Sequence, residues 1–280
     1  MDWKIWIEKR YTKSTAKAYK RDIVLFLDLV PDAKTANYQQ LISYLQELRQ
    51  HQKPASIHRQ LQSIKKYYQW LQFMELRKDN PAASIRLQDH KRKRDIQLQD
   101  LLTNQQLSSF WDYFMTKNYR YKHLKNRMLS IVSLLIFQAL TSEEIRTLKA
   151  SFLDFNTAQL DLPGTKTTNP RVLPLEPTQI LPLHYCWEEL KTNDDLIFEG
   201  LSSDSIHYLI SSAKLDFLRT KKCSPLRIRQ SVIASKFKLG WDLRKVQLFA
   251  GHRYPSSTEA YRLSGLEDLQ LSIQKHHPLG

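Results

Sequence analysis

The sequence predicts a mainly α protein with one small β-hairpin, organised as two domains. Apolar residues recur at helical spacing along most of the chain, whose 280 residues include only six glycines. Between residues 158 and 175 this pattern gives way to alternation around a turn rich in Thr, Asn and Pro, which is typical of a hairpin. The hydrophobic content of 41% is ample for one or two cores.

The first 86 residues have the pattern of a compact helical bundle. Ser14 and Thr15 precede an apolar series that predicts a capped helix ending near Pro31. Two further helices are predicted over residues 38–50 and 55–74, and a short element follows Asn80. Four or five helices of this size are enough for one domain.

Residues 87–98 are polar and strongly basic and predict a linker. Lying between two basic domains, its run of Lys and Arg at residues 91–94 is expected to follow a phosphate backbone; a solvated tether or a localisation-like cluster is the alternative. A second domain is predicted over residues 99–265, with a C-terminal tail over 266–280. Its elements are a helix start near Thr103, a buried helix from Met128 to Leu140, the hairpin, and helices over 203–218, 226–239, 242–250 and 256–263.

The charge distribution indicates a polyanionic partner. The net charge is +15, and the pI is about 9.7. Residues 1–100 contain 20 Lys and Arg against 11 Asp and Glu, and residues 201–250 contain 10 against 3. Two separate basic regions favour two DNA-facing surfaces, whereas the plainer alternative is a basic globular protein with no such partner.

Several classes of protein are excluded or disfavoured. Cys186 and Cys223 are too few for a disulfide framework or a metal site, so a reduced, cytoplasmic protein is expected. The N-terminus lacks the apolar segment of a signal peptide, and the longest apolar run, residues 131–140, is too short to span a membrane. Since the sequence also lacks a P-loop and metal-ligand spacing, we expect no cofactor and no metal.

Three separated segments contain the residues with the most specific pattern. A turn opens with Gly164, Thr165 and Lys166; Arg229 lies just inside a helix start after Ser224-Pro225; and Gly251-His252 precedes Tyr261 by nine positions counted from the histidine. In order and spacing these segments resemble the tyrosine recombinase, or phage integrase, family. The layout is most similar to the short Xer-type members, which have two domains.

The resemblance implies a cleavage mechanism without metal or nucleotide. Tyr261 would be the nucleophile, Lys166 the general acid for the leaving 5′-hydroxyl, and Arg229 a cation on the phosphate oxygens. His252 would contact the phosphate or orient the tyrosine. DNA would be cut and rejoined through a 3′-phosphotyrosyl intermediate.

Two positions depart from the family pattern. Thr141 replaces the first family arginine, although the glutamate that follows it in the family is matched by Glu144, and Leu226 replaces the histidine of the second motif. Loss of one phosphate-binding arginine is expected to weaken transition-state binding by roughly 2–4 kcal/mol. Arg146 and Arg227 are the predicted compensating cations, although helical spacing puts Arg146 on a different face from Thr141.

The resemblance extends over nearly the whole chain. It implies a SAM-like helical core-binding domain followed by the tyrosine recombinase catalytic domain, which together form a C-shaped clamp on double-stranded DNA. A solvated basic face is the alternative interpretation of the residues expected to contact DNA. These residues are Lys13, Thr15, Lys17, Lys20, Arg59, Lys65, Lys66, Lys91 and Arg92.

The predicted function is therefore site-specific DNA recombination or integration, as carried out by mobile elements and Xer proteins. The family implies a tetramer on DNA, formed with itself or with a second recombinase, in which the tail docks on a neighbouring protomer. Because of Thr141 and Leu226, the competing hypothesis is a catalytically weak descendant that acts as an architectural or regulatory DNA-binding protein. An RNA-binding protein is a third possibility, for which the sequence contains no motif.

Overall fold

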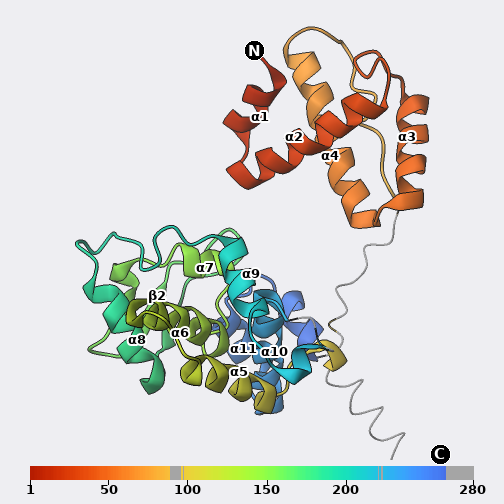
Figure 1. Cartoon of the computed structure of the whole chain (residues 1–280). Helices are drawn as coiled ribbons and strands as arrows, with labels where there is room; N and C mark the ends of the chain where they lie inside the picture. The colour runs from red at the N-terminus through yellow and green to blue at the C-terminus, as the bar shows by residue number, and fades with distance from the viewer. Residues whose placement is uncertain (89–95, 97, 220, 222, 263–280) are drawn as a thin grey trace, which may run out of the picture. The chain divides into compact units, whose positions relative to one another are not determined.

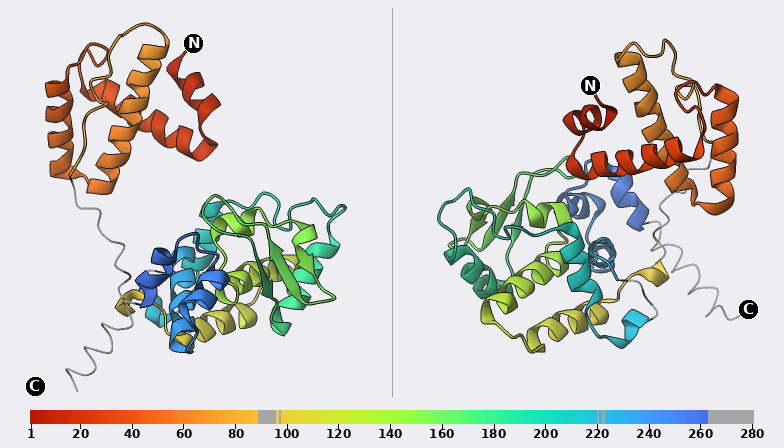
Figure 2. Two further views of the ribbon diagram at one scale, coloured as in Figure 1. Left: turned by 180° about the vertical axis from the view of Figure 1, so that it is seen from behind. Right: turned by 45° about the horizontal axis from the view of Figure 1, so that its top comes forward.

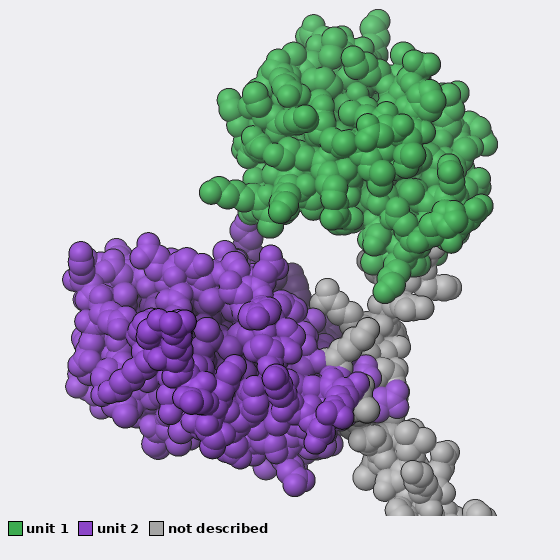
Figure 3. Space-filling view, viewed as in Figure 1, with its two compact units in different colours: residues 1–92 green, residues 93–280 purple. Residues whose placement is uncertain are grey.

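The computed structural model describes residues 1–88, 96, 98–219, 221 and 223–262. The chain divides into two compact units, residues 1–92 and 93–280 (Figures 1 and 3). The predicted linker spans this division, and Lys91 and Arg92 lie outside the described residues, as does the predicted tail. No helix in the described part of the chain is long and apolar enough to cross a membrane.

The first unit is a helical bundle around an aromatic core. The Asn37 side chain accepts a hydrogen bond from the backbone N–H of Gln40, and the Gln40 side chain accepts one from the backbone N–H of Asn37; this capping box starts the third helix. Phe26 packs edge-on against both Tyr67 and Tyr68, and all three rings are buried. The helices are α1 (Trp3–Arg10), α2 (Lys13–Leu29), α3 (Tyr38–His51) and α4 (Pro54–Phe73).

Three of these helices correspond to the predicted ones, and two features differ. Helix α1 was not predicted from the sequence, because only Trp6 and Ile7 of its eight residues are buried and so short a segment carries little periodic signal. The segment after Asn80 forms turns instead of a helix: the side-chain oxygen of Asn80 accepts a hydrogen bond from the backbone N–H of Ala82, and its backbone carbonyl accepts one from the N–H of Ala83.

The second unit is built around α6 (Lys122–Ile136). Every residue from Leu129 to Ile136 is buried, and α6 contacts α5, α8, α9 and α10. Thr103 and Gln106 form a capping box at the predicted start of α5. The helices that accompany α6 are α5 (Asn104–Thr116), α7 (Ser142–Arg146), α8 (Pro177–Glu188), α9 (Ser203–Ser211), α10 (Pro225–Lys238) and α11 (Leu243–Ala250), with short 3₁₀ turns at Leu98–Asp100, Ala150–Phe152 and Asp216–Arg219.

Helix α8 was not predicted, and its prolines explain why. Pro177 occupies the first turn, where its missing N–H has no helical acceptor to lose, but Pro182 lies inside the helix and removes one hydrogen bond. Burial of Pro182 and Leu183 and packing of α8 on α6 compensate for that loss. Tertiary contacts therefore override the local sequence signal here.

The described strands form one antiparallel sheet in the order β1 (Leu153–Asp154), β2 (Gln159–Leu162) and β3 (Arg171–Pro174), visible side by side in Figure 2. Leu160 pairs with Leu173 and Leu162 pairs with Arg171, as the predicted hairpin requires. Burial alternates along both strands, so Arg171 lies on the buried face together with Leu173. This alternation directs a charged side chain into the unit.

Candidate active site

The turn between β2 and β3 has a fixed backbone conformation. Gly164 has a φ of +82°, and a Cβ there would lie 2.7 Å from the carbonyl oxygen of Thr168, so only glycine fits. The backbone N–H of Thr165 donates to the same carbonyl at 3.0 Å. Lys166 is exposed at the tip of this turn, and its carbonyl oxygen accepts a hydrogen bond from Arg253 at 3.0 Å.

This turn is bound to the segment that follows α11. Thr168 forms an isolated antiparallel bridge with His252, and the backbone N–H of Asn169 donates to the carbonyl of Gly251 at 2.8 Å. Gly251 ends α11 in the left-handed conformation, which glycine adopts readily. The predicted Lys166 turn and the predicted Gly-His motif are therefore joined, although they are far apart in sequence.

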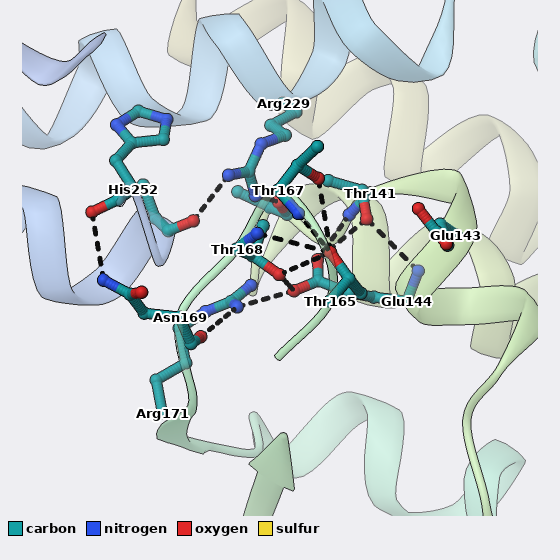
Figure 4. Close-up of polar contacts among 12 residues, drawn as sticks. Thr141, Glu143, Glu144, Thr165, Thr167, Thr168, Asn169, Arg171, Arg229 and His252 are labelled. Carbon is teal, nitrogen blue, oxygen red and sulfur yellow. Dashed lines mark hydrogen bonds and ion pairs between the residues drawn. The ribbon is translucent and has the colours of Figure 1, made fainter. Parts of the chain in front are cut away.

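Glu144 is the centre of a buried hydrogen-bond network (Figure 4). Its Oε2 accepts from the backbone N–H of Thr141 at 2.9 Å and from the Thr141 hydroxyl at 3.0 Å. Its Oε1 accepts from the Thr168 hydroxyl at 2.8 Å and from Nη1 of Arg171 at 2.6 Å. The carboxylate thus connects the start of α7 to the hairpin.

The network stabilises the ionised form of Glu144. Burial alone raises the pKa of this carboxyl, but the hydrogen bond and charge of Arg171, the N–H of Thr141 and the charge of Arg229 outweigh it. The pKa of Glu144 is consequently below its ordinary value. The buried pair with Arg171 is therefore ionic at neutral pH.

Arg229 is the second buried guanidinium of this region, with 5% of its surface exposed. It lies in the first half of α10 and donates to the carbonyl oxygens of Ala139 and Ala250. Ala139 itself has a φ of +51° in the bend between α6 and α7. Burial lowers the pKa of Arg229 to about 10, partly countered by Glu144, so the guanidinium stays charged at neutral pH.

His252 and Tyr261 stack face to face, with ring centroids 5.8 Å apart and planes 18° from parallel. Nδ1 of His252 is 2.8 Å from the hydroxyl of Thr258, which is fully buried in the helical segment 255–262. Burial, followed by the charges of Arg229 and Arg171, lowers the pKa of His252 to about 4. The imidazole is therefore neutral at pH 7.

Tyr261 is 7% exposed, and its side chain belongs to the core of the second unit. Its ionised form raises the pKa of Arg229, so the phenol lies within electrostatic reach of that guanidinium. The cluster thus combines a tyrosine, a neutral histidine and the two guanidinium groups of Arg171 and Arg229. Cations fixed around a tyrosine suit stabilisation of a charged phosphorus centre.

The described residues contain no group of three or more His, Cys, Asp or Glu side chains able to hold a metal ion.

Comparison with known proteins finds tyrosine recombinases along nearly the whole chain. Residues 3–73 match the phage integrase N-terminal SAM-like domain. The tyrosine recombinase XerD of Rickettsia prowazekii is 26% identical over 307 residues, covering 97% of this chain and 93% of the relative. XerD of Oceanobacillus iheyensis is 24% identical over 294 residues, covering 97% and 95%.

Solved structures share the fold of both units. The XerH site-specific recombinase bound to palindromic difH substrate, in a post-cleavage complex, has a TM-score of 0.69 at 15% identity, with 92% of this chain and 79% of that chain covered. The Tn1549 transposon integrase bound to transposon right-end DNA has a TM-score of 0.63 at 12% identity, with 99% of each chain covered. The chain is therefore similar to tyrosine recombinases over nearly its whole length, and its first unit matches the phage integrase SAM-like domain.

The two arginines predicted to compensate for Thr141, Arg146 and Arg227, lie outside the Glu144 network. Nε of Arg146 donates to the carbonyl of Leu201 at 3.1 Å on the surface, and Arg227 forms an ion pair with Asp100 at 3.1 Å. Both have partners outside the Glu144 network. Leu226, at the position of the family histidine, is 58% exposed at the start of α10.

The cation beside Thr141 is Arg171, which the sequence did not single out as a site residue. Its partner Glu144 lies 27 residues upstream, so no local pattern connects them. The strand alternation that predicts the hairpin does place Arg171 and Leu173 on one face, and this was the available signal.

On the first unit, some of the residues predicted to contact DNA are exposed. Lys13 and Lys17 are exposed on α2. Thr15, partly buried between them, accepts a hydrogen bond from the Thr12 hydroxyl at 3.0 Å. Lys66 on α4 is partly buried and donates to a neighbouring glutamine.

Other predicted contacts have structural partners. Lys20 pairs with Glu8, and Arg59 pairs with the buried carboxylate of Asp22. Lys65 donates to two backbone carbonyls of the segment after α4, at 3.1 and 2.8 Å. These interactions secure the bundle, so phosphate contacts by these three residues would compete with them.

Proposed function

We propose that this protein is a site-specific DNA recombinase that cleaves and rejoins DNA through a 3′-phosphotyrosyl intermediate on Tyr261. The observation that supports this most directly is the placement of Tyr261 in one pocket, stacked on a neutral His252 and within electrostatic reach of Arg229. Relatives that match nearly the whole chain are named tyrosine recombinases.

The cleavage step follows from the groups present. The phenolic oxygen of Tyr261 attacks the scissile phosphorus, and the bond from phosphorus to the 5′-oxygen breaks. Neutral His252, which stacks on the tyrosine ring, receives the phenolic proton, while Lys166 at the hairpin tip protonates the leaving 5′-oxygen. Arg229 neutralises charge on a non-bridging oxygen of the phosphorane.

Rejoining reverses these steps on another strand. A 5′-hydroxyl of the partner strand attacks the phosphotyrosine, which releases Tyr261 and reforms a phosphodiester. The bond energy is retained in the intermediate, so no nucleotide cofactor is required.

We further propose that the enzyme acts on double-stranded DNA as a tetramer in the cytoplasm. Two solved relatives are a XerH recombinase bound to palindromic difH and a lambda integrase dimer bound to a core site. The second of these is a dimer on DNA, and strand exchange between two such sites would bring four protomers together. Lys13 and Lys17, exposed on α2, are the proposed phosphate contacts of the first unit with least competition from internal partners.

Incubation with nicked suicide DNA carrying a recombination site tests the proposal. The full-length protein should trap as a covalent adduct that resists denaturation, and Lys166→Ala should slow its formation while leaving DNA binding unchanged. Binding without any adduct would instead indicate an architectural or regulatory DNA-binding protein.

A further inference from the structure

We propose that Arg171 is a phosphate-binding residue of this site and supplies the guanidinium that position 141 lacks. The inference rests on the proposed function and adds a residue to it. Two observations support it: Arg171 shares the Glu144 carboxylate with Thr141, and its Nε and Nη2 have no hydrogen-bond partner among the described residues.

The location brings the guanidinium next to Thr141. Nη1 of Arg171 is bound to one oxygen of Glu144, and Thr141 is bound to the other oxygen of the same carboxylate (Figure 4). A threonine there donates one neutral hydrogen bond, whereas the neighbouring guanidinium carries a full positive charge. Arg171 of the hairpin thus supplies a positive charge near the start of α7, on the other side of the Glu144 carboxylate from Thr141.

Two donors of Arg171 are unused. Its side chain is 4% exposed, and neither Nε nor Nη2 has a hydrogen-bond partner among the residues that the structure describes. Buried donors are nearly always paired, so two on one guanidinium point to an acceptor that is bound during function. Nε and Nη2 form one edge of the guanidinium plane, the edge that binds two oxygens of a phosphate side by side.

Arg229 differs in this respect. Its Nη1 and Nη2 both donate to backbone carbonyls, of Ala139 and Ala250, so its terminal nitrogens already have acceptors. Both arginines lower the pKa of His252, and Arg171 lowers that of Arg229, which shows two positive charges held close together. An anion between them would relieve this repulsion.

The guanidinium of Arg171 lies beside the segment that carries the nucleophile. A Cβ on Gly251 would be 2.5 Å from Nη1 of Arg171, so this glycine backbone lies directly against the guanidinium. Gly251 precedes His252, and Tyr261 is itself only 7% exposed. A shift of residues 251–262 on DNA binding would therefore open the tyrosine and the arginine edge to the same phosphate.

The test is single-turnover cleavage of suicide DNA by full-length Arg171→Lys. Lysine keeps a positive charge opposite Glu144 and so preserves the buried pair, but it removes the two-nitrogen edge. Cleavage of the phosphodiester should slow about 100-fold, the usual effect of losing one donor to the transition state. Arg146→Lys, which alters a surface arginine near α7, should cleave like the unchanged protein.

A second substrate separates phosphate binding from a structural role. In DNA with a methylphosphonate at the scissile position, one charged oxygen is replaced by a methyl group, so a residue that neutralises that oxygen is no longer needed. The deficit of Arg171→Lys should shrink to less than about tenfold on this DNA. An equal deficit on both substrates, or none on either, would overturn the inference while leaving the proposed function standing.

If Arg171→Lys fails to fold, the cleavage rate of Thr141→Arg tests the inference instead. With Arg171 already on the phosphate, a new arginine should change the cleavage rate less than about threefold, and a large acceleration would contradict the inference. If the unchanged protein forms no adduct at all, the proposed function fails, and the assignment of Arg171 fails with it.

Discussion

Replacement of Glu144 by glutamine should destabilise the second unit strongly, although the two side chains have the same shape. The carboxylate accepts four hydrogen bonds, two on each oxygen, from Thr141, Thr168 and Arg171. A glutamine offers one oxygen and one NH₂ group. Whichever way the amide turns, two of the four donors face an N–H instead of an acceptor.

The magnitude follows from the charges. Glu144 and Arg171 have side chains that are 2% and 4% exposed, so the substitution leaves a buried guanidinium without its carboxylate. Breaking such a pair from one side typically costs about 3–5 kcal/mol. The folded-state pKa of Glu144 is lowered from 4.5, so this stabilisation is present above pH 4.5 and is lost as the pH falls further.

Calorimetry of the full chain measures the effect. The melting transition of the second unit should move down by several degrees in Glu144→Gln, while that of residues 1–92 stays in place as an internal reference. Glu143→Gln removes the adjacent, exposed carboxylate of α7 and should melt like the unchanged protein. Equal melting of the two variants would refute the buried ion pair. The deficit of Glu144→Gln should also narrow below pH 4.5.

Three other predictions concern residues around and outside the pocket. Because the pKa of His252 falls from 6.5 to about 4 on folding, stability should drop by up to about 3 kcal/mol from pH 7 to pH 4.5, and His252→Gln should lack this component in pH-dependent unfolding. Gly251→Ala should cost about 1–3 kcal/mol more than Gly240→Ala in thermal unfolding, since both have positive φ but only Gly251 has a guanidinium against the new Cβ. Arg59→Ala should destabilise the first unit by about 1.5–3 kcal/mol, because the buried Asp22 carboxylate loses the guanidinium next to it and keeps the Ser63 hydroxyl and the more distant, exposed Arg21; unchanged unfolding together with weaker DNA binding would make Arg59 a DNA contact instead.

Local sequence signals predicted the parts of the fold that depend on nearby residues. The capping box of Thr103 and Gln106 marks the start of α5, and the alternation around residues 158–175 marks the hairpin. Helix α8 contradicts its local signal, since Pro182 is tolerated only because it packs on α6. The sequence could suggest the candidate site because its residues follow one another in a set order and spacing along the chain: Lys166, Arg229, His252 and Tyr261.

The ion-pair partners of charged residues could not be predicted from the sequence in this way. Arg171 finds Glu144 across the hairpin, and Arg59 finds Asp22 on another helix. Neither pairing has a fixed spacing, so both arginines look like ordinary basic positions in the sequence. Which cations are free for DNA and which hold the protein together becomes clear only from the folded contacts.

The most direct measurement is the identity of the residue that becomes linked to DNA. Suicide DNA labelled at the 5′ end of the cleaved strand should migrate with the denatured protein, and mass spectrometry of the digested adduct should place the nucleotide on Tyr261. Tyr254→Phe, which alters the exposed tyrosine seven positions earlier, should form the adduct normally, and Tyr261→Phe should bind DNA and form none. A normal adduct in Tyr261→Phe, or a nucleotide on any other residue, would contradict the proposed mechanism.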